Sequence, residues 1–565
     1  MPASKTETGE FRDAIIIGAG VTGIYQLKRL LDLGLNAIVL EAAADLGGTW
    51  YNNRYPGARF DSESVSYGYS FSREVLDEWH WKERFSPQPE NLRYLNFVAD
   101  KFDLRRHMTF GFRVASTIFD DAEGLWTVTG EDGRELRCRY LVLALGLLSV
   151  PTQPRLEGLD RFKGQMFHTH AWPHQPVDLA GKRVAVIGTG ATGIQVISAI
   201  ANEVAELTVF QRRPNWAAPL GNGPISEAEM TDIRSRYDEI FEICDRSPGG
   251  FVHESPVEGF YDVTPEQRRA FWDSLYDAPG FGIWMGNYRE IFTDDAANAE
   301  LSTYIAERIR RRVNDPQVAE KLIPKDHGFG VQRVPLESKY YEVYNLPHVR
   351  LVDLSETPIQ RVTETGVETA AEAFEFDIIV FATGFDAILG GFDRVDIRGA
   401  GGRRLRDDWR DGPSTYLGML ANGFPNLLIA TGPQSASASA NYPRGIELMV
   451  EWCTGLIQYA QEHNVRTFEA TQEAQTDWSE HVKSMYSLVL MRKAKSWFTG
   501  YNSNIEGREH GKTRYLVYNG GQPRYRRRIN RVADAGYAGV KFDPPIEDEN
   551  ARPAVKAPEA STAAK

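Results

Sequence analysis

The sequence predicts an α/β protein made of two parallel-sheet units, with a helical segment inserted into the second. An apolar, strand-like run leads into a G-x-G-x-x-G pattern twice, at residues 18–23 and at 188–193. Each time a second apolar run follows, which is the order of a dinucleotide-binding βαβ unit. Between Pro224 and Asp326, apolar residues recur every three or four positions, as in amphipathic helices. We therefore expect two Rossmann-like dinucleotide-binding domains with a helical insertion in the second.

The first glycine pattern is followed by an acidic residue at the end of the next strand-like run. That run, residues 37–40, leads into Glu41, eighteen positions past Gly23. A carboxylate here accepts the hydroxyl hydrogens of an adenosine ribose, and the glycines let backbone N–H groups approach a pyrophosphate at the helix N-terminus. The unit is predicted to bind FAD through Gly18, Gly20, Thr22, Gly23 and Glu41.

The second glycine pattern is followed by arginines instead. Its next strand-like run, residues 207–210, leads into Gln211 and then Arg212 and Arg213. A guanidinium fork suits a 2′-phosphate, so this site is predicted to prefer NADPH. A structural βα turn also explains one glycine pattern, but two such turns do not explain the change of charge. The residues assigned to NADPH are Gly188, Thr189, Gly190, Thr192, Gly193, Gln195, Arg212 and Arg213.

Composition disfavours several classes of function. The 565 residues carry a net charge of −13, which argues against a nucleic-acid partner. The three cysteines are far apart in sequence, so we expect no disulfide framework, redox cysteine pair or metal cluster. The longest apolar run, residues 140–150, is too short to span a bilayer, and the polar N-terminus lacks a signal-peptide pattern. We expect a cytoplasmic enzyme without a membrane partner; the oligomeric state stays open.

The order of strand-like runs predicts that the first unit is discontinuous. Runs at residues 140–146 and 377–384 both end in small-residue turns, where the chain is expected to leave the first unit and to return to it. Amphipathic helices are expected at residues 225–245 and 301–313. The domains expected are an FAD-binding domain (1–146 and 381–543), an NADP-binding domain with its linker motif (147–223 and 327–380), a helical insertion (224–326) and a disordered tail (544–565).

A segment between the two units resembles the signature of type I Baeyer–Villiger monooxygenases, F-x-G-x-x-x-H-x-x-x-W-P. The matching residues are Phe162, Gly164, His168, Trp172 and Pro173. Residues 47–61 match a second pattern of that family, and the resemblance extends to Trp497, so it covers most of the chain. In appearance the chain is most similar to the branch that acts on cyclic and terpenoid ketones.

The resemblance implies insertion of one oxygen atom of O2 beside a ketone carbonyl, giving an ester or lactone. In that family NADPH reduces FAD, and the reduced flavin captures O2 as a C4a-peroxide. The protein would then supply positioning and a fixed positive charge. By resemblance Arg333, just before an expected aromatic-rich strand at residues 340–345, is the catalytic cation, and Asp61 is the carboxylate that holds it. A surface arginine and an ordinary turn aspartate are the alternatives.

The resemblance also assigns further cofactor contacts. Gln332 departs from the family, which usually has a lysine there, and this weakens the expected preference for NADPH. Trp497 would close over the nicotinamide, although a core tryptophan is the commoner case. His168 is more often a hydrogen-bonded structural residue in such a linker than a catalytic one. The added FAD contacts are Gly48, Thr49, Trp50, Asp61 and Tyr67; the added NADP contacts are Arg59, Gln332 and Trp497.

Three other functions compete with this one. A heteroatom-oxidising flavin monooxygenase, acting on sulfides or amines, shares both glycine patterns but usually lacks Trp172-Pro173. A disulfide reductase of the same plan needs a cysteine pair, which the sequence lacks. A non-catalytic NADPH-binding flavoprotein remains the third alternative. The small-residue loop at 435–442 favours a cyclic or bulky ketone as the small-molecule substrate.

Overall fold

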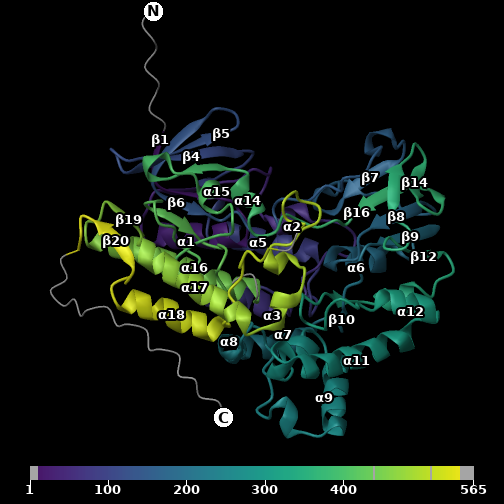
Figure 1. The fold of residues 1–565 in the computed structure, drawn as a ribbon. Coiled ribbons are helices and arrows are strands. Elements are labelled where there is room, and N and C mark those ends of the chain that lie inside the picture. The colour runs from purple at the N-terminus through teal and green to yellow at the C-terminus, as the bar shows by residue number, and fades with distance from the viewer. Residues whose placement is uncertain (1–9, 437–439, 510–511, 547–565) are drawn as a thin grey trace, which may run out of the picture.

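The computed structural model describes residues 10–436, 440–509 and 512–546. Two β-sheets lie apart, with a group of helices at the bottom of the view and the C-terminal helices beside the first sheet (Figure 1). The tail expected at 544–565 lies outside the described residues from 547 onward, as do residues 437–439 of the small-residue loop.

The first sheet is centred on β1 (Glu10–Ile17), which pairs in parallel with β2 (Ala37–Leu40) and β6 (Glu135–Leu143). β18 (Leu427–Ile429) also pairs in parallel with β6, so this sheet contains strands from the first and from the last third of the chain. β2 and the second half of β1 are buried on both faces, which is why they form continuous apolar runs. The other strands are β3 (Met108–Thr109), β4 (Val114–Asp120), β5 (Leu125–Gly130) and β17 (Asp396–Arg398), in the order β17-β4-β5-β6-β1-β2-β3.

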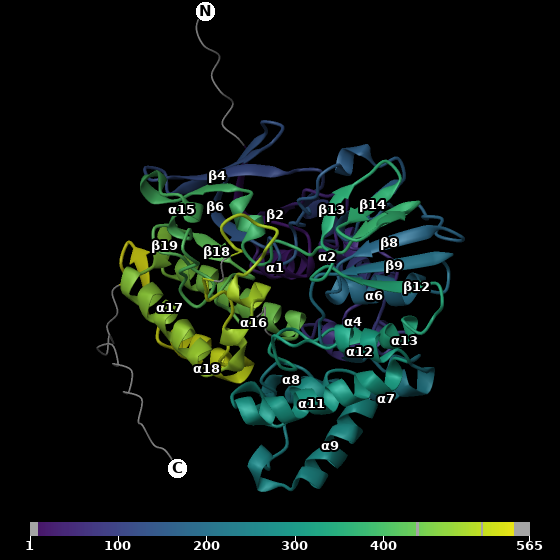
Figure 2. The same cartoon turned by 45° about the vertical axis from the view of Figure 1, so that its right-hand side comes forward.

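The second sheet has the order β12-β9-β8-β16-β7, and every pairing in it is parallel. Figure 2 shows β8, β9 and β12 side by side, with α6 (Ala191–Ile200) against them. The two Rossmann-like units predicted from the sequence are therefore confirmed. The strands are β7 (Gln165–His168), β8 (Arg183–Ile187), β9 (Glu206–Gln211), β12 (Val349–Asp353) and β16 (Ile378–Phe381); an antiparallel sheet of β13 (Ile359–Val362), β14 (Gly366–Thr369) and β15 (Ala373–Glu375) precedes β16.

Both units use the first glycine of the pattern in the same way. Gly18 and Gly188 have φ angles of +108° and +114°. A Cβ on Gly18 would lie 2.5 Å from the carbonyl oxygen of Ala144, and one on Gly188 would lie 2.4 Å from that of Ala382. Any other residue would therefore collide with the turn that follows the neighbouring parallel strand. This contact explains why each pattern begins with a glycine.

The two chain crossings between the sheets run side by side as a short antiparallel ribbon. Thr152 donates its backbone N–H to Gly384 O at 2.9 Å, and Asp386 donates its own to Val150 O at 2.8 Å. The hydroxyl of Thr152 donates to Thr383 O at 2.8 Å, and the hydroxyl of Thr383 donates to Thr152 O at 2.7 Å. Exit from the first unit and return to it thus occur at one place.

The segment between Pro224 and Asp326 is helical, as predicted, but one expected helix is divided. The amphipathic run at 225–245 forms α7 (Glu227–Ser235) and α8 (Tyr237–Arg246), because Arg236 between them leaves the helical region at φ −115°, ψ 10°. The expected helix at 301–313 falls in α11 (Asp295–Arg312), which begins earlier and ends one residue before Val313. The other helices here are α9 (Pro265–Asp277), α10 (Gly282–Met285), α11 (Asp295–Arg312) and α12 (Pro316–Leu322).

The prediction of an aromatic-rich strand after Arg333 is wrong. Only Leu336–Glu337 form a strand, β11, which pairs with β10 (Ala218–Pro219). The tyrosines instead start a short helix, α13 (Tyr340–Val343). The Glu337 carboxylate accepts the backbone N–H of Tyr340 at 2.8 Å, which satisfies a free amide at the start of that helix. Local capping therefore outweighs the strand preference of the aromatic residues.

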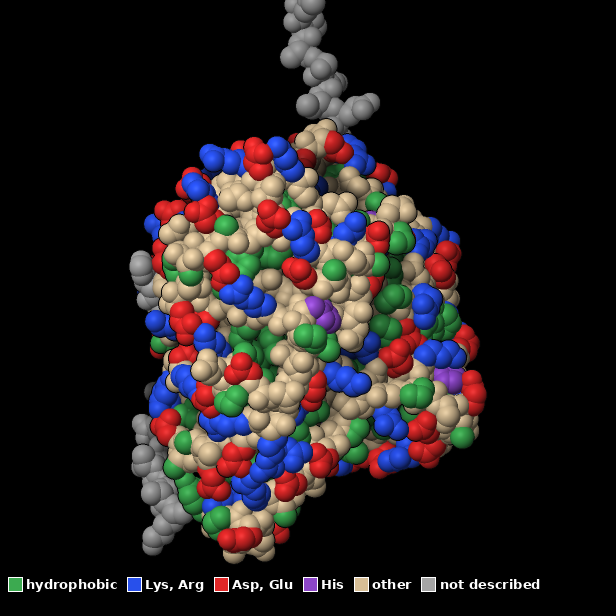
Figure 3. Space-filling model, turned by 90° about the vertical axis from the view of Figure 1, so that its right-hand side faces the viewer, with side chains coloured by type: hydrophobic (Ala, Val, Ile, Leu, Met, Phe, Trp, Pro, Cys, Tyr) green, Lys and Arg blue, Asp and Glu red, His purple; other side chains and the backbone are tan. Residues whose placement is uncertain are grey.

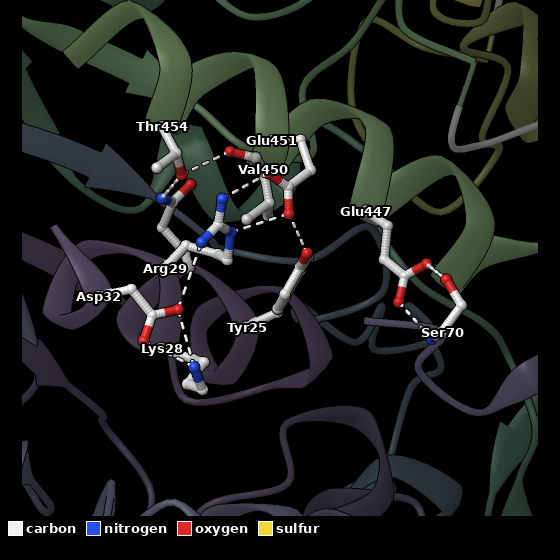
Figure 4. A network of polar contacts seen from close by, with 10 residues as sticks. Tyr25, Lys28, Arg29, Asp32, Ser70, Glu447, Val450, Glu451 and Thr454 are labelled. Carbon is white, nitrogen blue, oxygen red and sulfur yellow. Dashed lines mark hydrogen bonds and ion pairs between the residues drawn. The ribbon is translucent and has the colours of Figure 1, made fainter. Parts of the chain in front are cut away.

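The C-terminal helices support the first unit from outside. Figure 4 shows α1 (Val21–Asp32), which begins at the first glycine pattern, facing α16 (Tyr442–Glu462). The Glu451 carboxylate accepts two hydrogen bonds from Arg29, both of 2.8 Å, and a third from the Tyr25 hydroxyl. Gln26 donates to the Thr454 hydroxyl at 3.0 Å. The remaining elements are α2 (Thr49–Asn52), α3 (Ser64–Tyr67), α4 (Arg73–Glu78), α5 (Gln88–Lys101), α14 (Gly390–Asp393), α15 (Leu405–Asp408), α17 (Gln472–Ser487), α18 (Gln522–Asp534), β19 (Thr467–Ala470) and β20 (Val540–Asp543).

Each sheet has its own apolar core. The largest cluster of buried apolar side chains surrounds the first sheet, and a second one joins the second sheet to the helical insertion. On the face drawn in Figure 3, acidic and basic side chains are interspersed. Within the described part of the chain, every helix is too short or too polar to cross a membrane.

We predict that Gly193→Ala destabilises the protein and that Gly190→Ala does not. A Cβ on Gly193 would lie 2.1 Å from Gly188 O, whereas one on Gly190 meets no described atom within 4 Å. Overpacking of this kind costs about 1–3 kcal/mol or more, because α6 must move away from β8. Thermal unfolding followed by circular dichroism measures the difference. Equal unfolding midpoints for Gly193→Ala and the parent would contradict the prediction.

Candidate active site

The first cradle lies at the N-terminus of α1. The buried Glu41 carboxylate accepts the backbone N–H of Ala19 through Oε2 and that of Ala43 through Oε1, each at 2.7 Å. Each oxygen keeps a lone pair for a ribose hydroxyl. A Cβ on Gly48 would lie 2.9 Å from the Cα of Gly20, so only glycines leave this approach to the helix N-terminus open. The arrangement fits the adenosine diphosphate half of FAD.

Aromatic residues border this cradle. Trp50 donates its indole N–H to the Tyr67 hydroxyl at 3.0 Å, and Phe60 stacks on Tyr67 with ring centroids 4.1 Å apart. Burial raises the pKa of the Tyr67 phenol, so it stays a neutral donor. Thr49 opens α2 beside Trp50, and Thr22 is buried in α1. These predicted FAD residues therefore form one neighbourhood.

The second cradle lies at the N-terminus of α6, where Gly190 faces open space. The hydroxyl of Thr189 donates to Arg213 O at 2.9 Å. Thr192 lies in the first turn of α6, as the helix pattern predicts. Gln195 donates to Arg59 O at 3.0 Å and accepts from the Tyr55 hydroxyl at 2.9 Å. The segment containing Arg59 thus connects the second cradle to the first.

The two arginines expected at the 2′-phosphate lie under the segment that carries Trp497. Arg212 donates to the side chain of Asn504 at 3.3 Å, and Arg213 donates to Lys495 O at 3.3 Å. Burial, and then the positive charge of Arg213, lower the pKa of Arg212. Arg213 lies 3.6 Å from the Asp326 carboxylate, whereas no carboxylate contacts Arg212 among the described residues, so Arg212 is the more available cation for a dianionic phosphate. Trp497 itself is half-buried and packs against Phe498 and the first core.

Arg333 and Asp61 meet, although 272 positions separate them in sequence. Their nearest atoms, Nη2 and Oδ2, lie 3.5 Å apart. The Arg333 side chain is 34% exposed, whereas that of Asp61 is 5% exposed. The guanidinium lies 5.5 Å above the ring centre of buried Phe281, and Gln332 is half-buried next to it. A permanently charged group is thus held at a surface by a buried carboxylate.

Opposing effects set the charge of Asp61. Burial raises the pKa of this carboxyl, and the Arg333 guanidinium acts in the opposite direction. The second oxygen, Oδ1, is buried and has no hydrogen-bond partner among the described residues. Arg333, the backbone N–H of Leu336 and the charge of Arg59 thus all act against the rise that burial produces in the pKa of Asp61.

The linker motif sits at the crossing ribbon, and no contact among the described residues joins His168 to Arg333. His168 Nδ1 accepts the backbone N–H of His170 at 3.1 Å, and His168 Nε2 lies 3.3 Å from the Thr383 hydroxyl. Burial lowers the pKa of His168, which favours the neutral ring. Phe162 and Trp172 are buried, Pro173 follows Trp172, and a Cβ on Gly164 would lie 2.5 Å from Asp377 O. These contacts favour the structural role of His168.

Sequence reasoning missed two residues at this site. Tyr55 was not singled out, although it lies in the second family pattern and binds Gln195. Phe281 lies in the insertion, far from any motif, and only the folded chain brings its ring under Arg333. No periodicity in the sequence marks Phe281 as different from other core aromatics.

Comparisons with known proteins agree with this geometry. A family model described as flavin-binding monooxygenase-like matches residues 12–220. The chain is 44% identical over 537 residues to the 2-oxo-Δ(3)-4,5,5-trimethylcyclopentenylacetyl-CoA monooxygenase of Pseudomonas putida, which covers 94% of this chain and 98% of the relative. It is 40% identical over 543 residues to a Baeyer–Villiger monooxygenase of Pseudooceanicola batsensis, covering 96% and 98%.

A solved structure shows the same fold. The crystal structure of OTEMO in complex with FAD and NADP has a TM-score of 0.90 to this chain, with 44% sequence identity, and covers 94% of this chain and 99% of that one. The fold, the two cofactor cradles and the sequence identity over nearly the whole chain all indicate the same family. The chain belongs to the Baeyer–Villiger monooxygenase family of flavin-binding monooxygenases.

Proposed function

We propose that the protein inserts one oxygen atom of O2 beside the carbonyl of a cyclic or bulky ketone, giving a lactone or ester. The observation that carries this proposal is the contact of Arg333 with buried Asp61, on a segment that also joins the two dinucleotide cradles. The Pseudomonas putida relative is named for a cyclopentenyl compound, which supports a cyclic ketone as the substrate of this protein.

The two cradles fit the two cofactors. FAD, when bound, supplies the oxygen chemistry, and NADPH supplies the reducing hydride. Glu41 would hold the adenosine ribose of FAD, with Gly18, Gly20 and Gly23 at its pyrophosphate. Arg212 and Arg213 would hold the 2′-phosphate of NADPH, with Gly190 at its pyrophosphate, and the half-buried Trp497 would cover its nicotinamide end.

Arg333 would stabilise the negative charge that develops on the reacting oxygen atoms. Its guanidinium stays protonated on burial and presents several N–H donors in a fixed plane, so it needs little reorganisation during the reaction. Asp61 would fix the orientation of that plane through the contact of its Oδ2 with Nη2 of Arg333. A lysine would be a poorer choice because burial lowers its pKa and lets it lose the proton.

The proposed domain boundaries remain those expected from the sequence, and the pairing of β18 with β6 supports a discontinuous first domain. Cytoplasmic location is proposed because Cys138, Cys244 and Cys453 are all free and buried.

One experiment tests the function directly. NADPH oxidation is followed with cyclic, linear and aryl ketones, and with a sulfide and an aromatic amine, and the products are identified by mass spectrometry. We expect lactones or esters, most of all from cyclic ketones. Oxidation of the sulfide or amine without any ester from the ketones would identify a heteroatom oxygenase instead.

We predict that Glu41→Gln weakens retention of FAD. The amide has one acceptor oxygen, so its NH2 group would face the N–H of Ala19 or Ala43. A ribose hydroxyl also loses its charged acceptor, which costs about 1.5–3 kcal/mol of binding and corresponds to roughly a 13- to 150-fold weaker cofactor affinity. Dialysis followed by absorbance at the flavin maximum measures retention. Parental retention in Glu41→Gln would show that the first site is wrongly assigned.

We predict that Arg212→Ala lowers the preference for NADPH over NADH. One lost charge-assisted phosphate contact costs on the order of 1.5–3 kcal/mol, seen mainly in KM if the contact acts equally throughout the reaction. Gln332→Lys, which restores the usual family residue, should strengthen NADPH binding. Steady-state kinetics with both nucleotides provide the ratio. An unchanged ratio in Arg212→Ala would exclude Arg212 from the 2′-phosphate site.

We predict that Arg333→Ala keeps its FAD but forms ester at least about a hundredfold more slowly, because a preorganised cation is lost where charge develops. Arg333→Lys should fail nearly as badly. Asp61→Ala should be milder if the carboxylate only orients Arg333. Stopped-flow absorbance separates flavin reduction from the oxygen-dependent steps. Ester formation by Arg333→Ala at the parental rate would remove this residue from the mechanism.

A further inference from the structure

A contact between Glu63 and His253 joins the Asp61 segment to the helical insertion. His253 Nε2 and Glu63 Oε1 lie 2.6 Å apart, and the two side chains are only 16% and 14% exposed. Glu63 stands two positions after Asp61, at the start of α3. His253 lies in the loop between α8 and α9 of the insertion. The pair therefore connects the segment that carries Asp61 to the helical insertion. The proposed reaction requires these two parts of the chain to keep fixed relative positions.

The insertion segment 280–284 lies against this pair. A Cβ on Gly280, which has a φ angle of +83°, would lie 2.2 Å from Glu63 Oε1 and 3.2 Å from His253 Nε2. No residue with a side chain fits there without displacing Glu63. The Gly280 backbone is itself fixed, because its N–H donates to Leu220 O at 3.1 Å.

The same segment also reaches the residues around Arg333. Phe281, next to Gly280, has its ring 5.5 Å from the Arg333 guanidinium carbon. Trp284 donates its indole N–H to Gly330 O at 3.2 Å, three positions before Arg333. Segment 280–284 thus lies against Glu63, two positions after Asp61, and contacts Gly330, three positions before Arg333. It therefore packs close to both Asp61 and Arg333.

We propose that Glu63 and His253 are positioning residues, whose contact anchors segment 280–284 and thereby holds Arg333 against Asp61. This inference rests on the proposed function of Arg333. Neither residue touches a reacting group, so their effect passes through Phe281 and Trp284. A misplacement of about 1 Å at a catalytic group is enough to lower a rate a hundredfold, so a distant anchor has a measurable effect.

The test compares holoenzyme variants with cyclohexanone as the probe. In Glu63→Ala we expect the fraction of oxidised NADPH recovered as lactone to fall about tenfold, with the remainder released as hydrogen peroxide. Flavin reduction by NADPH without ketone should stay within about twofold, because the cradles are untouched. Glu63→Gln keeps an acceptor oxygen for His253 and should recover most of the lactone yield.

A matched control uses another histidine and glutamate that join the same two parts of the chain. His80 Nδ1 lies 2.9 Å from Oε1 of Glu227 in α7, and Glu227 is 80% exposed. Glu227→Ala removes a carboxylate from a histidine without touching segment 280–284 in any described contact. It should leave the lactone yield unchanged.

Hydrogen–deuterium exchange supplies a readout that does not depend on turnover. Glu63→Ala should speed exchange in peptides covering residues 279–286 and 328–334, and Glu227→Ala should not. If Glu63→Ala does not accumulate as folded protein, His253→Ala removes the same contact from the other side and should give the same two results.

Unchanged lactone yield in folded Glu63→Ala and His253→Ala would overturn the proposal, as would an equal loss in Glu227→Ala. Failure of the parent to form any lactone would overturn the proposed function instead. In that case the exchange data still decide whether the Glu63 contact anchors segment 280–284.

Discussion

The close approach of two backbones fixes the architecture of this protein. Gly18 lies against the turn after β6, and Gly188 lies against the turn after β16, each too close for a side chain. The spacing between each nucleotide-binding helix and its strand is set in the same way, because a Cβ on Gly23 or Gly193 would collide with the carbonyl oxygen of Gly18 or Gly188. Because the chain crosses between the units directly after the same two turns, they also determine where the crossings meet. Both cradles and the passage between them thus depend on one kind of steric constraint.

Electrostatic dependence links the units in a second way. Asp61 is buried and its pKa is raised by that burial, and the Arg333 guanidinium is the largest of the effects that act against this rise. A buried carboxylate deprived of its partner is costly, whereas the Arg333 side chain is 34% exposed and keeps part of its contact with water. Loss of the contact would therefore cost more at the aspartate, and the aspartate directs the arginine. This asymmetry suits a cation that must act at a surface.

Much of the fold followed from local pattern. Apolar runs identified β1 and β8, which lead into the glycine patterns, and β2 and β9, which follow them, because strands buried on both faces leave a plain signal. The charge at Glu41 and at Arg212 separated the two cradles for a chemical reason that does not need coordinates. The pairing of Arg333 with Asp61 was implied only by family resemblance, since spacing in sequence contains no distance.

The failures have local physical causes. The aromatic run after Arg333 was expected as a strand only from the family resemblance, but here the Glu337 carboxylate accepts the first N–H of a helix. The break at Arg236 interrupts a pattern whose apolar spacing is continuous. Phe281, Glu63 and His253 could not be found because their importance comes from tertiary contacts between segments with no shared motif.

The ribbon formed by the two crossings limits how the sheets can move. Two separate tethers would allow each sheet to tilt, slide and rotate with little restraint. Because Thr152 and Thr383 hydrogen-bond to each other reciprocally, the two crossings instead form one narrow antiparallel strip. Such a strip resists stretching and in-plane shear, since both would break hydrogen bonds, and it yields to twist about its long axis. A shift of one cofactor site past the other along this strip would therefore have to break the reciprocal bonds of Thr152 and Thr383.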